Sequence, residues 1–387
     1  MDVLKDQWIL NSSLINISRV VLNSSMQNLT VNETDAYVPD ANAPDNMQEL
    51  IDVFQIIGYI IQPLILVVGV AGNILTLVTM MFSRFKDLTS RYIILFLALS
   101  DTALLLTQPL NKFWIIKLIG IDLRALSTLS CKIFFVIFRS AKMTSSWLVV
   151  LLCVERYVAV IFPLRAKSIL RKHYIVVAIA LDYVIITTYN SVWHFSSGIQ
   201  GGICKPDLPS LQQSVFVTIG VTFYSFIPTI ILLVLTPHIV FRLFRHAKMR
   251  QALKGNLSSA TNSSMSANKK QITKTLKASV MVIGVLISYG ILIIPISTVH
   301  IYSFTAGFSA FDANSVAFFI FREISQILEQ INYAINFFFY VVCSRQFRQR
   351  LNEILHCSPL RFRKYFFKSV TTGNSTSVLS RSDSINQ

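Results

Sequence analysis

Long runs of apolar residues, separated by short polar segments, dominate the chain from about position 54 to position 343. Each run provides the roughly 20 residues that an α-helix needs to cross a bilayer. The pattern therefore predicts seven membrane-spanning helices, over residues 54–81, 92–114, 132–162, 174–195, 214–241, 276–303 and 315–343. A composition with 53% hydrophobic and 14% charged residues supports this prediction, because soluble domains carry about 25% charged residues.

The polar segments flank an all-α, seven-helix bundle that we expect at 53–343. Residues 1–52 and 358–387 are polar tails that we expect to be disordered. Between the bundle and the second tail, residues 344–357 predict a short amphipathic helix on the membrane surface. Its apolar face is formed by Phe347, Leu351, Ile354 and Leu355.

The net charge of +16 would by itself fit a nucleic-acid-binding protein. A chain as apolar as this one, however, has too little polar surface to present a basic patch. No nucleic-acid partner is therefore expected. The basic residues instead gather in the first, third and fifth connecting loops and in the C-terminal tail. Since Lys and Arg mark cytoplasmic loops, we expect a multi-pass protein of the plasma membrane with its N-terminus outside.

The N-terminal tail has the features of an exported segment. Its first 50 residues contain seven acidic and two basic residues. Five Asn-x-Ser/Thr sequons also lie there, and they matter only on the lumenal or extracellular side. The predicted glycosylation sites are Asn11, Asn16, Asn23, Asn28 and Asn32.

Several short motifs lie at specific places in the predicted spans. They are Gly72-Asn73, Leu97–Asp101, Cys131, Glu155-Arg156-Tyr157, Pro228, Pro295 and Asn336–Tyr340. In this order and spacing they resemble the landmarks of rhodopsin-like (class A) G protein-coupled receptors, over about 54–357. The resemblance implies a receptor rather than an enzyme, activating heterotrimeric G proteins as the sixth helix moves outward. Arrestin, receptor kinases and membrane lipids would be further partners.

The resemblance assigns roles to several residues. Those expected to act in activation and G protein coupling are Glu155, Arg156, Tyr157, Pro295, Asn336 and Tyr340. Cys131 and Cys204 are expected to form a disulfide on the outer, oxidising side, and Cys357 is a candidate for palmitoylation, with a free thiol as the alternative. No cofactor is expected apart from an allosteric sodium ion.

The expected sodium ligands are oxygen atoms inside the bundle. They belong to Asp101, Ser145, Asn332 and Asn336. Carboxylate, hydroxyl and amide oxygens suit a hard cation. The alternative is a protonated Asp101 that is hydrogen-bonded to Asn73 and Asn336.

Some family positions are altered. The sixth helix has Ile293 where a tryptophan is usual, and the seventh has Phe337 where proline is usual. The segment from Asn336 through Cys343 to Arg348 resembles invertebrate receptors for FMRFamide-like and myosuppressin-like neuropeptides.

The expected pocket residues argue against two ligand classes. Phe138 replaces the aspartate of monoamine receptors, and Gln330 replaces the lysine that binds retinal. The pocket is expected to contain Phe138, Arg139, Lys142, Glu323, Gln326, Glu329 and Gln330. Its mixed charges favour a short amidated peptide, unless Lys142 and Glu329 only pair with each other. The alternatives are a lipid or small-molecule ligand, or a transporter, for which no internal repeat is visible.

Overall fold

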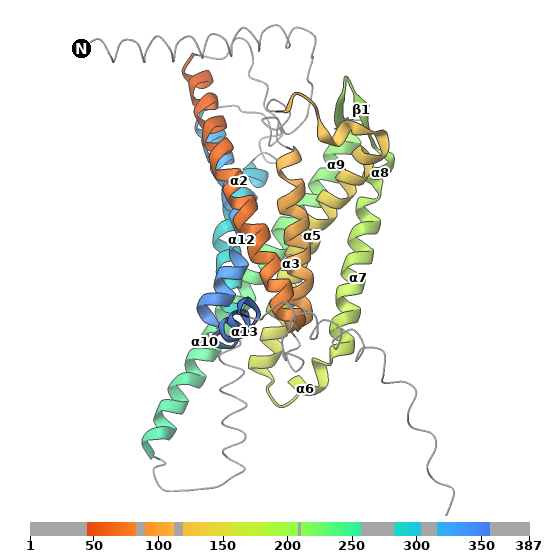
Figure 1. Ribbon diagram of the computed structural model, residues 1–387. Coiled ribbons are helices and arrows are strands. Elements are labelled where there is room, and N and C mark those ends of the chain that lie inside the picture. Colours follow the sequence, from red (N-terminus) through yellow and green to blue (C-terminus); the bar gives the residue numbers. More distant parts are fainter. Residues whose placement is uncertain are drawn as a thin grey trace, which may run out of the picture.

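The computed structural model describes residues 45–82, 90–111, 119–207, 210–256, 282–302 and 316–356. Its long helices lie side by side in a seven-helix bundle (Figure 1). They are α2 (Asp45–Phe82), α3 (Ser90–Thr107), α5 (Thr128–Ile161), α7 (Lys172–Asn190), α9 (Ser210–Val221) continued by α10 (Ile227–Asn256), the helix Val282–Tyr302, and α12 (Val316–Cys343). Each corresponds to one of the seven predicted spans. Short helices α6 (Ala166–Ile169) and α8 (Val192–Phe195) flank α7, and η3 (Leu123–Leu126) precedes α5.

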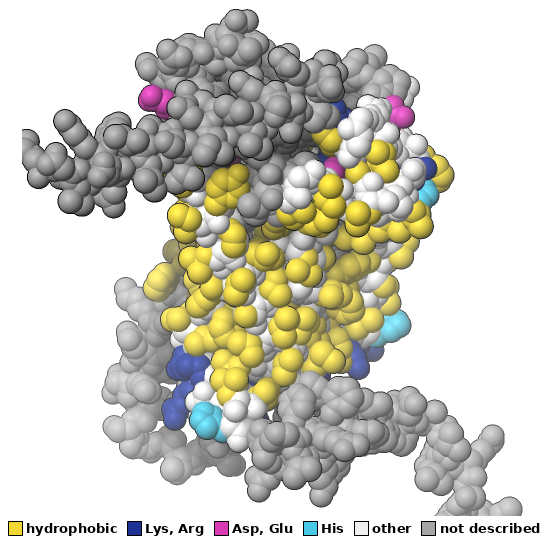
Figure 2. Space-filling view, turned by 45° about the horizontal axis from the view of Figure 1, so that its top comes forward, with side chains coloured by type: hydrophobic (Ala, Val, Ile, Leu, Met, Phe, Trp, Pro, Cys, Tyr) yellow, Lys and Arg dark blue, Asp and Glu magenta, His cyan; other side chains and the backbone are white. Residues whose placement is uncertain are grey.

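Six of these helices are long and apolar enough to cross a membrane. The seventh, α12, carries three charged residues and several amides, which lower its mean hydropathy. Those polar groups include Glu329, Asn332 and Asn336, and all three are buried against other helices. The outer surface is correspondingly apolar, and the face in Figure 2 is a broad hydrophobic belt with basic side chains gathered towards one end.

Two helix ends differ from the sequence prediction. Helix α2 begins at Asp45, before the expected boundary at 53. Helix α3 ends at Thr107 rather than near 114, and the short helix η2 (Pro109–Asn111) follows. Pro109 explains this end, because proline lacks an N–H donor and disfavours helical geometry in the residue before it.

A β-hairpin, which the sequence did not predict, lies at one end of the bundle. Strands β1 (Ser197–Gln200) and β2 (Ile203–Pro206) pair antiparallel, with Ile199 opposite Cys204. Gly201 and Gly202 join the strands with φ of 58° and 77°. Glycine tolerates these angles, and a two-residue turn of this hand matches the twist of the strands. We call this end of the molecule the hairpin end.

The opposite end carries α13 (Arg345–Leu355), and we call it the α13 end. The Ser344 hydroxyl starts this helix by accepting a hydrogen bond from the backbone N–H of Phe347 at 3.2 Å. Phe347 and Leu351 of its predicted apolar face are buried in the core of the bundle, whereas Leu355 is 60% exposed. The location of this helix on the membrane surface stays a prediction.

The core lies between α3, α5, α10, α12 and the helix Val282–Tyr302. Helices α2 and α12 approach closely at Gly69, where an added Cβ would lie 2.7 Å from the Cβ of Ala334. Ile293, the residue at the usual tryptophan position, is fully buried in this core. The middle of the bundle is therefore closely packed with apolar side chains.

Candidate functional site

A cavity of about 130 Å³ opens among the helices at the hairpin end. Side chains of both charges, amides and aromatic rings line it: Gln108, Phe138, Arg139, Lys142, Tyr189, Trp193, Tyr224, His300, Gln326 and Glu329 are among them. These residues come from the turn that follows α3, from α5, α7 and α8, from the fifth and sixth spans and from α12. The cavity therefore lies where a ligand would contact most of the bundle at once.

Glu329 is the centre of this cavity's polar network. Its carboxylate lies 2.9 Å from the Lys142 ammonium and accepts hydrogen bonds from the hydroxyls of Tyr224 and Tyr333, the latter at 3.1 Å. The side chain of Glu329 is 2% exposed and that of Lys142 is 21% exposed. The Lys142–Glu329 pair that the sequence suggested is thus present, and Glu329 is held by three donors.

Tyr224 reaches Glu329 because of a local helix distortion. The segment η4 (Thr222–Phe226) is π-helical and lies between α9 and α10. A π turn adds a residue to one helical turn and so rotates the side chains that follow. Tyr224 and Ser225 are buried here, and the Ser225 hydroxyl is hydrogen-bonded to that of Ser297 on the sixth span. No feature of the sequence predicts this π turn.

Arg139 and Phe138, both on α5, lie against aromatic rings. The Arg139 guanidinium lies 4.1 Å from the centroid of the Trp193 ring, and Phe138 stacks on Phe134 at 5.8 Å. Both line the cavity, as does Gln326. Gln330 is buried, but it does not line this cavity.

The prediction that Glu323 faces Arg139 and Lys142 is wrong. Glu323 instead pairs with its neighbour Arg322 at 2.9 Å. It does not line the cavity, whereas Glu329, nearly two turns further along α12, does. Glu323 and Glu329 therefore differ in environment despite sharing a helix.

A disulfide joins Cys131, near the start of α5, to Cys204 in β2. This confirms the predicted pair. Asp122 reinforces the connection, because its carboxylate accepts hydrogen bonds from the backbone N–H of Cys204 and from the Arg124 side chain, each at 2.9 Å. Asp122 and Arg124 are both buried. Together these contacts fix the hairpin across the end of the bundle, and the contribution of Asp122 and Arg124 was not predicted.

Asp101 lies fully buried halfway along the bundle. It accepts hydrogen bonds from Ser145 at 2.6 Å and from the Asn336 amide at 2.8 Å. Two of the predicted ligands therefore contact it. Asn332 is buried but has no hydrogen bond to Asp101 in the described part of the chain. Asn73, a predicted partner of a protonated Asp101, instead donates to the backbone carbonyl of Tyr333 at 3.2 Å.

Glu155 and Arg156 form an ion pair near the α13 end, with 2.8 Å between the Glu155 carboxylate and the Arg156 Nε. Each side chain is 3% exposed. The hydroxyl of Ser90, on α3, also donates to Glu155 at 2.9 Å, a contact that was not predicted. Tyr157 packs edge-on against His238 of α10. The adjacent pair is therefore enclosed by helices rather than exposed at a helix end.

The remaining predicted activation residues lie in or near the core. Tyr340 is buried and packs against Phe347 of α13, with ring centroids 5.8 Å apart. Phe337, at the usual proline position, also contacts Phe347, and α12 continues through this position without interruption. Pro295 is partly buried within the helix Val282–Tyr302.

The predicted modification sites lie outside the described residues. They are the glycosylation sites Asn11, Asn16, Asn23, Asn28 and Asn32 and the candidate lipidation site Cys357.

A seven-helix membrane bundle with a charged cavity beneath a disulfide-linked hairpin has the architecture of a seven-transmembrane receptor. Comparison with protein families agrees, because the family described as "7 transmembrane receptor (rhodopsin family)" matches residues 72–340. The chain belongs to this family. It is a family of receptors, not of enzymes.

Individual relatives are more distant. Growth hormone secretagogue receptor type 1 is 36% identical over 108 residues in Sus scrofa, and 35% identical in Homo sapiens. These matches cover 27% of this chain and only 28% of the relatives' length. Galanin receptor type 1 of Rattus norvegicus is 23% identical over 347 residues, which is 86% of this chain and 92% of that receptor. The narrower resemblance to invertebrate FMRFamide and myosuppressin receptors remains a prediction.

Proposed function

We propose that this chain is a plasma-membrane receptor that binds an extracellular peptide at the hairpin end and activates a heterotrimeric G protein at the α13 end. The observation that carries the proposal is the cavity at the hairpin end, where Arg139, Lys142 and Glu329 come together among aromatic rings. The acidic N-terminal tail and the basic loops support an extracellular position for this end, by the charge rule.

A short amidated peptide suits the chemistry of this cavity. Its lining has two basic groups, Arg139 and Lys142, against one acid, and Glu329 already accepts bonds from three donors. This excess of basic groups favours a peptide terminus that presents carbonyl oxygens over one that presents an ammonium group. Relatives named as receptors for galanin and for growth hormone secretagogues support the general class. The FMRFamide-like and myosuppressin-like peptides are the more specific form of this proposal.

Coupling would begin when the ligand stabilises one of two arrangements of the bundle, since it can shift their balance only by binding one more tightly. The sixth helix, Val282–Tyr302, would move outward around Pro295. The Glu155–Arg156 pair would then open, and Arg156 would contact the G protein. Receptor kinases and arrestin would act on the Ser/Thr-rich C-terminal tail, through the charge that phosphorylation adds.

The direct test is a screen of amidated neuropeptides against cells that express the full chain, with calcium and cyclic AMP as readouts. We expect at least one peptide to give a saturable response that weakens tenfold or more in Arg139→Ala. The same peptide with a free carboxylate at its C-terminus is the matched ligand control. Responses to lipids or small apolar molecules alone would reject the peptide proposal in favour of the small-molecule alternative.

Glu155→Gln is expected to raise ligand-independent signalling severalfold. The substitution removes the charge that holds Arg156, while the glutamine can still accept the hydrogen bond from Ser90. The measurement is basal cyclic AMP and calcium at matched surface expression. Glu353→Gln is a suitable control, because Glu353 also pairs with an arginine, Arg350, but the pair is exposed on α13 and should contribute little. Equal basal signalling in both variants would contradict the role of the buried pair.

We also propose that Asp101 binds sodium. Besides the Asp101 carboxylate and the Ser145 hydroxyl, the Oδ1 atom of Asn336 is buried without a hydrogen-bond partner in the described part of the chain. Such an oxygen fits a hard cation, and Asn332 would complete the set. Bound sodium would supply positive charge that neutralises Asp101 between α3, α5 and α12.

Sodium should therefore stabilise the purified receptor in the absence of ligand. We expect the thermal unfolding midpoint to be higher in sodium chloride than in choline chloride at equal ionic strength. Asp101→Asn should abolish this difference, whereas Asp122→Asn, which alters a buried acid at the hairpin end, should keep it. A midpoint that is insensitive to the cation in the unmodified receptor would argue against the site.

A further inference from the structure

The π turn in the fifth span deprives one backbone carbonyl of its usual donor. In an α-helix, the N–H of Ile227 would donate to the carbonyl of Phe223, four residues earlier. In η4 this N–H donates instead to the carbonyl of Thr222, five residues earlier. The next residue along the chain cannot replace it, because Pro228 has no N–H. The Phe223 carbonyl therefore needs a donor from outside its own helix.

Solvent is a poor source of this donor at this position. The turn lies within the span Val215–Arg245, and the Phe223 side chain is 45% exposed on the outer surface of the bundle. In a membrane that surface faces lipid, where the protein itself has to satisfy its backbone polar groups. A carbonyl left without a donor would favour return of the segment to α-helical geometry, because that geometry restores the bond from Ile227.

Trp147, on the neighbouring helix α5, supplies the donor. Its indole Nε1 donates to the Phe223 carbonyl at 3.0 Å. The same indole packs against a buried cluster formed by Met143, Ile186 and Tyr224. Trp147 therefore satisfies the carbonyl that the π turn leaves without a donor, and it also contacts Tyr224, whose position the turn determines.

Two buried hydroxyl groups depend on the π turn. The Tyr224 hydroxyl donates to Glu329 in the cavity, and the Ser225 hydroxyl is hydrogen-bonded to that of Ser297 on the sixth span. A change from π to α geometry shifts the helix by one residue, which is about 100° of rotation. Such a rotation would move these hydroxyls away from their partners, unless the helix on one side of the turn gave up its own packing.

We propose that Trp147 is a positioning residue of the ligand cavity, because its indole N–H holds the fifth span in the π geometry that places the Tyr224 hydroxyl on Glu329. Trp147 does not line the cavity itself, so it acts through Tyr224. Without its hydrogen bond, Glu329 would keep Lys142 and Tyr333 as donors but lose Tyr224. The effect on peptide binding rests on the proposed function, whereas the effect on the π turn does not.

The test replaces Trp147 with benzothienylalanine, which has the shape of tryptophan but a sulfur atom in place of the indole N–H. The thermal unfolding midpoint of the purified full-length receptor, measured without peptide, should fall by about 3 °C, since one hydrogen bond is lost. Tyr224→Phe should lower the midpoint by a similar amount. Because Trp147 acts through Tyr224, the combined variant should be no less stable than the benzothienylalanine variant alone. Trp147→Phe lacks the same N–H and should show the same coupling to Tyr224→Phe.

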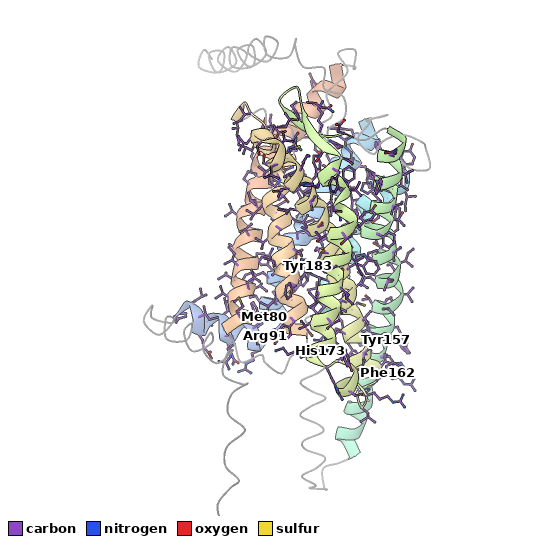
Figure 3. All side chains as sticks on the ribbon, turned by 90° about the vertical axis from the view of Figure 1, so that its right-hand side faces the viewer. Met80, Arg91, Tyr157, Phe162, His173 and Tyr183 are labelled. Carbon is purple, nitrogen blue, oxygen red and sulfur yellow. A yellow bond between two sulfur atoms is a disulfide. The ribbon has the colours of Figure 1, made fainter. Side chains whose placement is uncertain are left out.

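Tyr183→Phe is the matched control, because it also removes a side-chain donor to a backbone carbonyl. The Tyr183 hydroxyl bonds to the Phe96 carbonyl of α3 at 3.3 Å. Helix α7, which carries Tyr183, lies on the right flank of the bundle in Figure 1, and Figure 3 views this flank with Tyr183 labelled about halfway along it. The effects of Tyr183→Phe and Tyr224→Phe on the midpoint should add, because these residues share no hydrogen-bond partner.

The same variants have a functional readout, which is the potency of the amidated peptide selected by the screen. It should fall about tenfold in the benzothienylalanine variant and in Tyr224→Phe, and no further in their combination. The inference is overturned if the replacement of Trp147 leaves the midpoint unchanged, or if its effect adds fully to that of Tyr224→Phe. The midpoints require no peptide, so a receptor that responds to none would reject the proposed function and still leave this inference open to its own test.

Discussion

Replacing Glu329 with alanine is expected to destabilise the receptor by about 3 kcal/mol and to abolish its ligand response. The substitution removes the carboxylate that neutralises Lys142, and it leaves the hydroxyls of Tyr224 and Tyr333 without their acceptor. Removing one member of a buried pair costs this much because the remaining charge stays desolvated. The measurements are the thermal midpoint of the purified receptor and the dose–response curve for the peptide identified by screening.

Two variants separate loss of the pair from general damage. Glu323→Ala, on the same helix, removes an acid that pairs with Arg322 outside the cavity, and it should change potency much less. The double substitution Lys142→Met with Glu329→Leu should be more stable than Glu329→Leu alone, because no charge is then left unpaired. If the double variant were as unstable as the sum of both single variants, the pair would not be the source of the effect.

Loss of the disulfide is the second large effect that we expect. Cys131→Ser or Cys204→Ser should each remove most receptor from the cell surface and abolish signalling. The bond anchors β2 to α5, and removal of a native disulfide costs about 2–5 kcal/mol. Surface receptor is measured with an antibody to an N-terminal tag, and signalling with the second-messenger assays.

The double variant Cys131→Ser with Cys204→Ser should be no worse than either single variant, since all three lack the same bond. Cys343→Ser provides the matched control, because Cys343 is a free cysteine at the end of α12. Normal surface level and full potency in the double variant would show that Asp122 and Arg124 hold the hairpin without the disulfide.

The sequence predicted the parts of this structure that depend on local pattern or on single-residue chemistry. The hydropathy pattern located all seven helices. The family landmarks predicted that Asp101 lies close to Ser145 and Asn336. The charges on α5 and α12 were sufficient to suggest the Lys142–Glu329 pair. Each of these inferences needs only a helix repeat or the pairing of opposite charges inside an apolar bundle.

The parts that were missed depend on helix rotation and on contacts between distant segments. Tyr224 reaches Glu329 only because a π turn changes the rotation of the fifth span. Glu323 has the same chemistry as Glu329, but it lies beside Arg322 and away from the cavity. The buried Asp122–Arg124 pair lies in the segment before α5, where the sequence has no hydrophobic periodicity from which its contacts could be predicted. Phe347 of α13 packs against Tyr340 of α12, a contact that an amphipathic pattern alone does not specify.

The polarity of α12 has a consequence for biosynthesis. This helix carries Arg322, Glu323 and Glu329 together with buried amides, so its insertion into the bilayer as an isolated segment would be unfavourable. It is also the last of these seven spans to leave the ribosome, when the helices that carry Asp101 and Lys142 have already been made. We therefore expect α12 to enter the membrane by docking against a partly assembled bundle. A substitution in α3 or α5 that removes one of its partners would then lower the yield of fully inserted chains, in addition to weakening the finished receptor.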